Sequence, residues 1–334
     1  MPAAPVPGTT DRRIDALLTL LSENPMIVIS GQKIAREIGV SRSAVWQWTQ
    51  RLRALGVRVK GHPRSGYQIE RVPDVLSPTL LRRQLRSSLF GKHIHHFFKA
   101  GSTNAIAFDL GRAGEPQGAV VLAEEQSAGR GRAGRSWHSE KTSGIYVTVL
   151  LRPAISPLVA PLITLLAGLA VRDAVLEETG LAPDLRWPND LLMAGKKFCG
   201  ILTEMHAETD RVRFVVVGIG IDVNHTRMPE PLAGLATSLR MVTGRSHSRL
   251  HLLVRLLRNL ETYYNRFLAE GPAPILARFC ETSSFAKGKR VRISAATETY
   301  TGITDGLEPN GLLRVRREDG RLAIVISGDV AEAN

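Results

Sequence analysis

Residues 126–137, with the sequence QSAGRGRAGRSW, combine residue types that suit the binding of an anion. Glycine lets the backbone adopt positive φ angles and approach a ligand closely. The guanidinium group of arginine carries a fixed positive charge and can grip a phosphate or a carboxylate through two hydrogen bonds. We call this segment the anion clamp. Its glycines and arginines are Gly129, Gly131, Gly134, Arg130, Arg132 and Arg135.

Two other classes of glycine-rich segment fit the anion clamp less well. The order GxxxxGK[ST] of a P-loop is absent from it. Glycine- and arginine-rich segments that bind nucleic acid are usually long and disordered, whereas this one is brief and is flanked by predicted strands. The segment alone therefore predicts a flexible clamp over phosphates or a carboxylate.

Several other blocks of the sequence share one family resemblance with the anion clamp. The clamp strongly resembles the GRGRxGR.W signature of biotin protein ligases, the family that includes the bacterial biotin operon repressor. Other blocks of that family follow in the family's order, which argues against a chance resemblance. They are STN at residues 102–104, RWPND at 186–190, KKFCGIL at 196–202 and VGIGIDVN at 217–224.

The resemblance implies an ATP-dependent biotin protein ligase. In this family the biotin carboxylate attacks the α-phosphorus of ATP, which gives biotinyl-5'-AMP and pyrophosphate. A lysine of biotin carboxyl carrier protein, a part of acetyl-CoA carboxylase, then attacks this mixed anhydride to form an amide. Both steps build negative charge on oxygen atoms, so positioning and cationic groups should carry catalysis. Biotin, ATP and Mg²⁺ escorting the triphosphate are expected, and no residue is assigned as a protein metal ligand.

The resemblance also implies roles for individual residues. Lys197 is expected near the biotin carboxylate and the attacked phosphate, where an ammonium group can direct three donors. Arg130 and Arg132 would close over the carboxylate and the phosphates, and Asp190 completes the catalytic set. The residues expected to bind biotin are Ser102, Thr103, Asn104, Gln126, Arg130 and Lys197. Those expected to bind the nucleotide are Gly129, Gly131, Arg132, Gly134, Arg135, Trp137 and Asn189.

The roles of four residues near these motifs stay open. Trp137 would wall the adenine with its flat ring or is an ordinary core tryptophan. Asp190 would take the proton from the incoming lysine, hold the metal, or serve a structural role. At position 222 this chain has Asp222, where many family members have asparagine, so this carboxylate would help bind a metal or is a tolerated substitution. Cys199 is expected to pack behind Lys197, because no neighbouring base would activate its thiol.

The N-terminal residues predict a winged helix-turn-helix. Residues 14–21 repeat apolar side chains at helical spacing, and a short helix over 32–38 ends at Gly39. After a turn with Ser41 as N-cap, a third helix is expected over 42–55, closed by Gly56. Residues 57–60 and 67–69, around the turn at 61–66, then predict a β-hairpin wing.

The charge of this region predicts DNA as its partner. The chain carries a net charge of +13, and residues 41–64 contain six basic residues without any Asp or Glu. A small helical packing module is the alternative, but the helix order, the wing and the charge agree on DNA binding. Glutamines on the third helix suit base edges, and arginines suit phosphates. The predicted DNA-binding residues are Arg42, Ser43, Gln47, Gln50, Arg51 and Arg64.

Beyond the wing, the pattern changes to that of an α+β fold. Strands are predicted over residues 119–123, 145–151 and 212–219, and one long helix over 158–178. The family resemblance implies a class II synthetase-like catalytic domain here and a small SH3-like β-barrel after residue 284. We therefore expect three domains: a winged helix-turn-helix at 1–75, a catalytic domain at 76–284 and the small barrel at 285–334.

The number and spacing of the cysteines predict reduced thiols in a reducing compartment. It has two cysteines, Cys199 and Cys280, without the spacing of a zinc or redox site. The N-terminus has no basic stretch before an apolar run, which argues against a signal peptide. The longest apolar run, residues 158–171, is shorter than the roughly 20 residues that span a bilayer. A cytoplasmic protein without a membrane partner is expected.

Two other functions compete with the ligase. A lipoate-type ligase shares a related fold and chemistry, but the complete anion clamp and the DNA-binding module argue against it. A repressor that only senses biotin or biotinyl-AMP is disfavoured by the intact Lys197, Arg130 and Arg132. For regulation, we expect the adenylate to favour a homodimer that binds a two-half-site operator of biotin genes.

Overall fold

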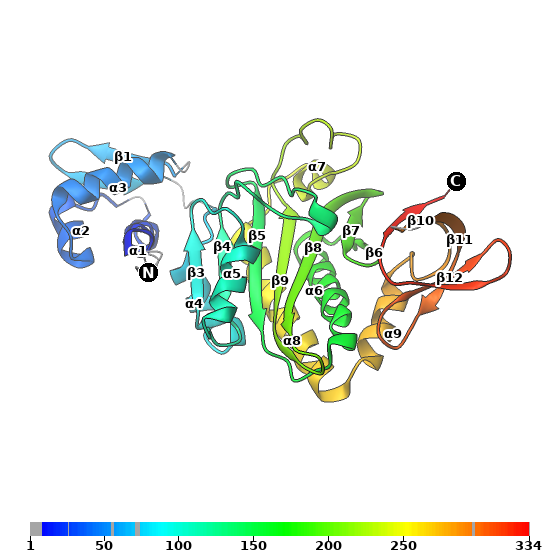
Figure 1. Ribbon diagram of the computed structural model, residues 1–334. Helices are drawn as coiled ribbons and strands as arrows, with labels where there is room; N and C mark the ends of the chain where they lie inside the picture. The colour runs from blue at the N-terminus through cyan, green and yellow to red at the C-terminus, as the bar shows by residue number, and fades with distance from the viewer. Residues whose placement is uncertain (1–8, 26, 55–56, 71–73, 296–297, 334) are drawn as a thin grey trace.

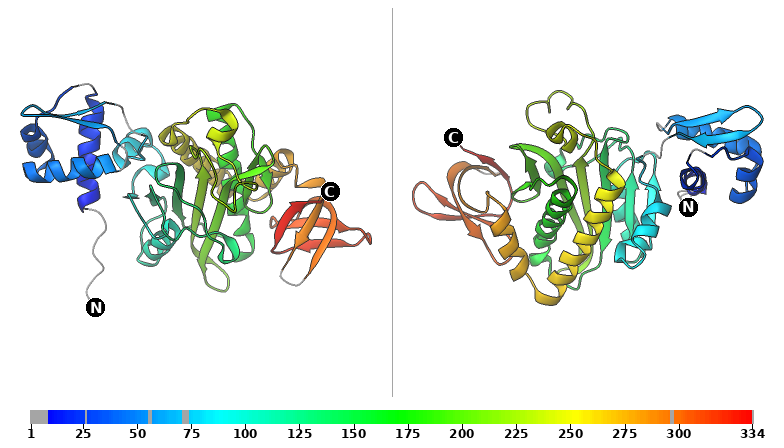
Figure 2. Two further views of the ribbon diagram at one scale, coloured as in Figure 1. Left: turned by 90° about the horizontal axis from the view of Figure 1, so that it is seen from above. Right: turned by 180° about the vertical axis from the view of Figure 1, so that it is seen from behind.

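The computed structural model describes residues 9–25, 27–54, 57–70, 74–295 and 298–333. They form three units: an N-terminal helical unit, a central sheet covered by helices, and a C-terminal sheet (Figure 1). The first and last units lie at opposite ends of the central unit in both further views (Figure 2). The predicted domain boundaries near residues 75 and 285 fall in connectors between these units and stay predictions.

The N-terminal unit has the element order of a winged helix-turn-helix, as predicted. A left-handed Gly39 ends the second helix, and Ser41 Oγ accepts a hydrogen bond from the backbone three residues later. The hairpin turn is tighter than predicted, because the first strand continues to His62 and the second already begins at Gly66. The predicted end of the third helix at residues 55–56 lies outside the described residues. The elements are α1 (Thr9–Glu23), α2 (Gly31–Ile38), α3 (Arg42–Ala54), β1 (Val59–His62) and β2 (Gly66–Ile69).

Apolar side chains at helical spacing form the core of this unit, and one aspartate attaches it to the next. The Asp15 carboxylate on α1 accepts hydrogen bonds of 2.6 Å from the hydroxyls of both Ser77 and Thr79. Ser77 is the N-cap of α4 (Pro78–Gln84), which leads into the central unit. The buried core side chains include Ile14, Leu17, Leu18, Leu21, Val45, Trp48 and Leu52.

The central unit is a seven-stranded sheet of order β3-β4-β5-β9-β8-β7-β6. The pair β3 and β4 is parallel, and the other neighbours are antiparallel. Helix α5 (Thr103–Arg112) packs on one face, while α6 (Pro161–Thr179) and α8 (Arg249–Glu270) pack on the other (Figure 1). This layering confirms the predicted α+β class. The strands are β3 (Ile94–Phe97), β4 (Val120–Ala123), β5 (Gly144–Leu151), β6 (Asp184–Arg186), β7 (Asp190–Met193), β8 (Lys196–Ala207) and β9 (Val212–Asp222).

The predicted long helix is a core helix. By length and composition the stretch Pro157–Thr179 is long and apolar enough to cross a membrane, whereas residues 158–171 alone are shorter than the roughly 20 residues required. However, 67% of its most apolar window is buried inside the protein, where it packs against α8 and β8. Its apolar surface is thus used in folding. The remaining helices are η1 (Leu89–Gly91), η2 (Arg132–Gly134), η3 (Pro157–Val159), α7 (Leu239–Thr243) and α9 (Ala273–Thr282).

The C-terminal unit is a five-stranded antiparallel sheet of order β13-β12-β11-β10-β14, in agreement with the predicted small β domain. Its buried side chains, such as Val291 and Leu313, join the same apolar cluster as the central sheet. In addition, the indole N–H of Trp187 donates to the carbonyl of Gly311 at 2.9 Å. The two units therefore share one core. The strands are β10 (Lys287–Ser294), β11 (Thr299–Leu307), β12 (Leu313–Arg317), β13 (Leu322–Val325) and β14 (Asp329–Glu332).

Candidate active site

A cavity of about 420 Å³ lies between the anion clamp, the start of α5 and strands β7 to β9. This volume is in the range of small-molecule sites, roughly 300–1000 Å³. Of the residues predicted to act in catalysis or to bind biotin and nucleotide, only Gly129 and Gly134 do not line it. Those that do are Ser102, Thr103, Asn104, Gln126, Arg130, Gly131, Arg132, Arg135, Trp137, Asn189, Asp190 and Lys197. Residues from motifs distant in the sequence are thus brought together, and their roles stay predictions.

Gly200 on β8 and Gly220 on β9 line the cavity, and we call this pair the glycine floor. Gly200 and Gly220 are direct partners across the two strands, and the Trp137 indole lies against both. A Cβ added at Gly220 would lie 2.5 Å from the indole nitrogen, and one at Gly200 would lie 2.8 Å from the ring. Trp137 is only half-buried and lines the cavity, which does not fit the alternative of a core tryptophan.

A third glycine accommodates the start of α5, which carries residues predicted to bind biotin. A Cβ at Gly218 would lie 1.9 Å from Asn104 Oδ1, so only glycine allows the start of α5 to approach β9 this closely. The Asn104 oxygen accepts a hydrogen bond of 2.7 Å from the Thr148 hydroxyl. Its amide nitrogen donates to Glu204 at 2.8 Å. Thr148 and Glu204 were not predicted from the sequence.

Thr103 and Gln126 form one hydrogen-bonded unit. The side-chain oxygen of Gln126 accepts from the backbone N–H and the hydroxyl of Thr103, at 2.8 and 3.0 Å. The Gln126 amide group donates to the hydroxyl of Ser139 at 3.0 Å. These contacts fix an amide group at the wall of the cavity, where a polar ring can exchange hydrogen bonds with it. Ser139 is a further contributor that the sequence did not reveal.

Lys197 is held by a carboxylate on the neighbouring strand. Its Nζ lies 2.6 Å from Asp190 Oδ1, and the other oxygen of Asp190 accepts from Arg186 at 2.7 Å. The same ammonium group lies 5.4 Å from the centre of the Trp137 ring, within the range of a cation–π contact. The site therefore holds a cation that is partly desolvated and paired with an acid of its own.

Two arginines of the anion clamp have partners far away in the sequence. Arg132 donates to Asn189 Oδ1 at 3.0 Å, and burial lowers the pKa of this guanidinium group. Arg135 donates to both oxygens of Asp329 on β14, at 2.6 and 2.7 Å. Arg130 is exposed. The C-terminal sheet thus contributes Asp329 to the cavity wall, a contribution that no local pattern in the sequence indicates.

Three buried titratable groups lie at the end of β9 or beside it on β8, where Cys199 pairs with Ile221. Asp222 is 5% exposed and lines the cavity, and burial raises the pKa of its carboxyl group well above the ordinary value. His225 is 1% exposed, and burial lowers its pKa to about 4, so the ring is neutral near pH 7. Cys199 is fully buried, which raises the pKa of its thiol. A high thiol pKa agrees with a packing role for Cys199 rather than a nucleophilic one.

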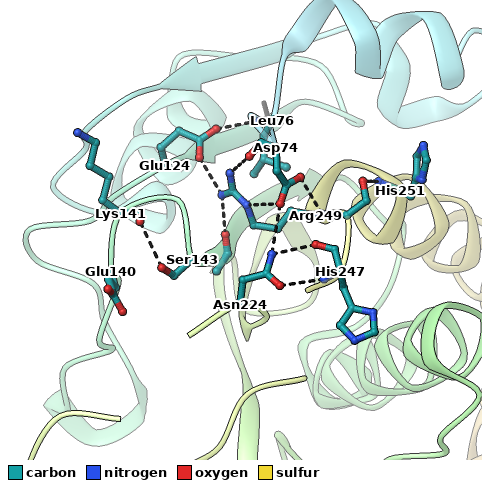
Figure 3. A network of polar contacts seen from close by, with 12 residues as sticks. Asp74, Leu76, Glu124, Glu140, Lys141, Ser143, Asn224, His247, Arg249 and His251 are labelled. Carbon is teal, nitrogen blue, oxygen red and sulfur yellow. Dashed lines mark hydrogen bonds and ion pairs between the residues drawn. The ribbon is translucent and has the colours of Figure 1, made fainter. Parts of the chain in front are cut away.

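Asn224, the last residue of the VGIGIDVN block, does not line the cavity. It belongs to a polar network around Arg249 (Figure 3). The fully buried Arg249 donates to Glu124 at 2.8 Å and to the side chain of Asp74 at 3.1 Å. Asn224 donates to the same Asp74 oxygen at 3.3 Å. Because Asp74 precedes α4, this network ties the connector from the N-terminal unit to the end of β9.

The predicted DNA-contacting residues lie mostly on the surface of the N-terminal unit. Arg42, Ser43, Gln47 and Arg51 on α3 are exposed, as is Arg64 in the hairpin turn, whereas Gln50 is half-buried. Ser43 shares a hydrogen bond with the Ser41 hydroxyl. Trp46, 56% exposed on the same helix, was not predicted to contribute. Its large apolar ring is available to a partner that binds this surface.

Comparison with known proteins identifies two regions of the chain. The model of the Biotin/lipoate A/B protein ligase family matches residues 100–222, and an HTH domain model matches residues 12–68. The chain is 36% identical over 316 residues to the bifunctional ligase/repressor BirA of Bacillus subtilis, covering 94% of this chain and 97% of that protein. It is 28% identical to BirA of Escherichia coli, over 90% and 92% of the two chains.

A solved structure supports the same assignment. Biotin protein ligase from Aquifex aeolicus, in complex with biotin and ATP, superposes with a TM-score of 0.63 at 27% identity, covering 72% of this chain and 100% of that one. The anion clamp, Lys197 and the glycine floor all fall within residues 100–222, the region that the ligase family model matches. From these matches together, the chain belongs to the biotin protein ligase family, in its bifunctional ligase/repressor form.

Proposed function

We propose that this chain activates biotin with ATP and transfers it to a lysine of biotin carboxyl carrier protein. The observation that carries the proposal is the gathering of Lys197, Arg130, Arg132 and Gln126 around one cavity of about 420 Å³. These groups supply cations for a carboxylate and for phosphates, and an amide for a polar ring. The relatives' names, including biotin--[acetyl-CoA-carboxylase] ligase, support the same reaction.

Lys197, Arg130 and Arg132 carry the first step. An oxygen of the biotin carboxylate attacks the α-phosphorus of ATP, the bond to the β-phosphate breaks, and pyrophosphate leaves. Negative charge builds on the phosphoryl oxygens, which fixed cations in a partly dry site stabilise. The ion pair between Lys197 and Asp190 shows that this ammonium group already accommodates a carboxylate.

Asp190 is the candidate acid–base group of the second step. The amine of the acceptor lysine attacks the carbonyl carbon of biotinyl-5'-AMP, AMP leaves, and the nitrogen loses a proton. Asp190 lies beside Lys197 and is 16% exposed at its side chain, so it can take that proton. We therefore keep Asp190 in the catalytic set with Lys197, Arg130 and Arg132.

The binding residues divide between the two ends of the cavity. Thr103 at the start of α5 and Gln126, which follows β4, would exchange their mutual hydrogen bonds for the ureido ring of biotin, with Ser102 and Asn104 beside Thr103. The anion clamp and Trp137 would enclose the adenylate. The nucleotide-binding set is Gly129, Gly131, Arg132, Gly134, Arg135, Trp137 and Asn189.

Mg²⁺ is expected to enter bound to ATP rather than to a protein cage. Among the described residues that line the cavity, three are carboxylates. Asp190 is engaged by Lys197 and Arg186, Asp329 by Arg135, and Asp222 is buried with a raised pKa. Mg²⁺ requires charged or polar oxygen ligands, and these three do not offer a ready set. The phosphate oxygens of ATP supply them instead.

The second function is repression of biotin genes in the cytoplasm. The winged helix-turn-helix presents Arg42, Ser43, Gln47 and Arg51 on the exposed side of α3, with Gln50 and Arg64 nearby. Formation of biotinyl-5'-AMP would favour a homodimer, whose two α3 helices read two operator half-sites. Electrophoretic shift of the operator of biotin genes, dependent on biotin and ATP, tests this part.

The ligase function is tested with labelled biotin, ATP, Mg²⁺ and a biotin carboxyl carrier domain. We expect label on the acceptor lysine, and pyrophosphate release when the acceptor is omitted. Adenylate without transfer to any acceptor would support the alternative of a biotin-sensing repressor. Labelling with lipoate in preference to biotin would support the alternative of a lipoate-type ligase. Absence of adenylate from folded protein would contradict the proposal.

A further inference from the structure

Three side chains with metal-ligating atoms meet next to the cavity. They are His138 and Glu140, which follow the anion clamp, and His225, which follows β9. The ligand atoms of all three lie within 4.8 Å of one another, and the two imidazole rings have centres 6.0 Å apart. None of the three was predicted as a functional residue from the sequence.

Neither ring nitrogen of His225 has a hydrogen-bond partner within the described part of the chain, although the residue is only 1% exposed. Its Nε2 lies 3.8 Å from Glu140 and its Nδ1 lies 3.6 Å from Asp222, which is beyond hydrogen-bonding distance. A buried polar group without a partner costs roughly 1–3 kcal/mol. Such a group in a folded protein therefore calls for a ligand that would satisfy it.

We propose that His138, Glu140 and His225 together bind a divalent transition-metal ion of the zinc class. Two imidazoles and one carboxylate are a donor set that zinc and its neighbours prefer, whereas Mg²⁺ prefers oxygen ligands. With bonds of about 2.0–2.2 Å, tetrahedral ligand atoms are separated by roughly 3.3–3.6 Å. The present separation of 3.8 Å between His225 and Glu140 requires only a small adjustment.

Asp222 faces the ring nitrogen of His225 that points away from Glu140. Ring nitrogens that bind a metal through one atom usually donate the other N–H to a carboxylate or carbonyl oxygen. Here Nε2 of His225 faces Glu140, and Nδ1 faces Asp222. Asp222 thus acts as a positioning residue that orients His225, and the ion keeps an open position for water or another ligand.

Hydrogen bonds hold the backbone at two of the three ligands, Glu140 and His225. The carbonyl of Glu140 accepts hydrogen bonds from the Tyr146 hydroxyl at 2.9 Å and from the backbone of Ser143 at 3.3 Å. The carbonyl of His225 accepts from the buried Ser238 hydroxyl at 2.7 Å. Figure 3 shows Glu140 on the loop that leads to Ser143. The exposed side chains of His138 and Glu140 therefore have to move to close the site around the buried His225.

Another group of two histidines and a glutamate provides a contrast. His93 and His95 both contact the same oxygen of Glu115, at 3.4 and 3.0 Å. Nε2 of His95 is hydrogen-bonded to Glu115, whereas both ring nitrogens of the buried His225 lack a hydrogen-bond partner among the described residues. The contrast makes His95 a suitable control residue.

A metal at this place would restrain the anion clamp. His138 directly follows Trp137, whose indole lies against Gly220 near the end of β9. An ion shared by His138 and His225 would join the base of the clamp to the segment after β9. The site does not depend on the proposed ligase function, since metal can be bound in the absence of biotin and ATP.

The test uses the full chain without an affinity tag, freed of metal with a chelator that is then removed. Zn²⁺ binding is measured by equilibrium dialysis, and Co²⁺ binding by its visible spectrum. We expect one ion per chain, and we expect H138N and E140Q to weaken binding by at least roughly 10- to 100-fold. H225N should abolish Zn²⁺ binding. The controls H95N and H251N, the latter at an exposed histidine, should leave Zn²⁺ binding unchanged. Circular dichroism checks the folding of each variant.

The restraint of the clamp is read from trypsin cleavage at its arginines. Zn²⁺ should slow this cleavage in the unchanged chain and in H251N, but not in H138N. Absence of stoichiometric binding, binding that persists in both H138N and H225N, or loss of binding in H95N would overturn the metal site. Stoichiometric binding without protection from trypsin would overturn its connection to the anion clamp.

Discussion

Asp190 forms an ion pair with Lys197, in which Oδ1 of the carboxylate lies 2.6 Å from the ammonium nitrogen. The other carboxylate oxygen, Oδ2, accepts a hydrogen bond of 2.7 Å from Arg186. The cation assigned to the biotin carboxylate therefore already contacts an acid of the protein. In the proposed mechanism, binding of biotin would exchange one carboxylate for another at Lys197, which would avoid leaving a partly buried charge unpaired. Arg186 would keep Asp190 in place during this exchange.

Replacement of Lys197 tests this relationship. We expect K197M to lower kcat/KM for adenylate formation roughly 10²- to 10³-fold, the usual effect of removing one group that stabilises charge in the transition state. The measurement is pyrophosphate release with biotin and ATP. The matched control is K196M, since Lys196 is exposed on the neighbouring position of β8 and does not line the cavity. Equal activity of K197M and K196M would contradict the assignment.

The glycine floor predicts a steric effect of a single methyl group. In G220A the new Cβ would lie 2.5 Å from the Trp137 indole, so the ring must leave its place on β9. We expect a loss of roughly 1–3 kcal/mol in the free energy of unfolding and a raised KM for ATP. Urea unfolding and steady-state kinetics measure the two effects.

The control for the floor is G234A. Gly234 lies in an exposed loop, and an added Cβ there meets nothing within 4 Å. Both stability and KM should stay as in the unchanged chain. If G220A binds ATP as well as G234A does, Trp137 does not form part of the nucleotide site.

The buried pair of Arg249 and Glu124 predicts a dependence of stability on pH. Burial raises the pKa of Glu124, but Arg249, His96 and the backbone of Leu76 outweigh it and lower the pKa from 4.5 to about 2. A lowered carboxyl pKa stabilises the folded chain above pH 4.5, by roughly 3 kcal/mol. This contribution is lost as the pH falls from 4.5 to 2, and urea unfolding across that range measures it.

Replacement of Arg249 should reverse the direction in which acidification changes the stability of the folded chain. In R249M, Glu124 stays buried without its cation, so stability near pH 7 should fall by about 3–5 kcal/mol and should recover partly on acidification. The double variant E124Q/R249M removes the unpaired charge and should regain part of the loss. A double variant no more stable at pH 7 than R249M would contradict this account.

The contact between Arg135 and Asp329 predicts only a weak effect. Both side chains are more than half exposed, and exposed ion pairs contribute about 0–1 kcal/mol. D329A should therefore speed the release of biotinyl-5'-AMP by no more than about fivefold. Release is followed by filter binding of labelled adenylate. A much larger effect would mean that the C-terminal sheet, rather than the clamp itself, closes the site.

The sequence predicted elements and contacts where the signal is local. The helices of the N-terminal unit follow from apolar spacing, and the anion clamp follows from adjacent glycines and arginines. Helix α8 was missed, although Leu253, Leu256, Leu257 and Leu260 repeat at helical spacing. That periodic signal was available in the sequence.

The missed contacts join residues that are far apart in the chain. Asp329 reaches Arg135 across 194 positions, and Glu124 reaches Arg249 across 125. The spacing of residue types in one sequence carries no information about such pairs, because the packing of the sheets decides them. For the same reason His138 and His225 could not be paired before the structure placed both next to the cavity.

The exposed side of α3 predicts two separable effects on DNA binding. Arg51 is exposed and is predicted to contact a phosphate, so R51A should weaken binding evenly across sequences and reduce the slope of log affinity against log salt by about 1. Gln47 is suited to a base edge, so Q47A should instead reduce discrimination between operator and unrelated DNA, by roughly 1–3 kcal/mol. Fluorescence anisotropy at several salt concentrations measures both quantities. R266A, on α8 of the central unit, is the control and should leave both unchanged, whereas identical behaviour of all three variants would place the DNA elsewhere on the protein.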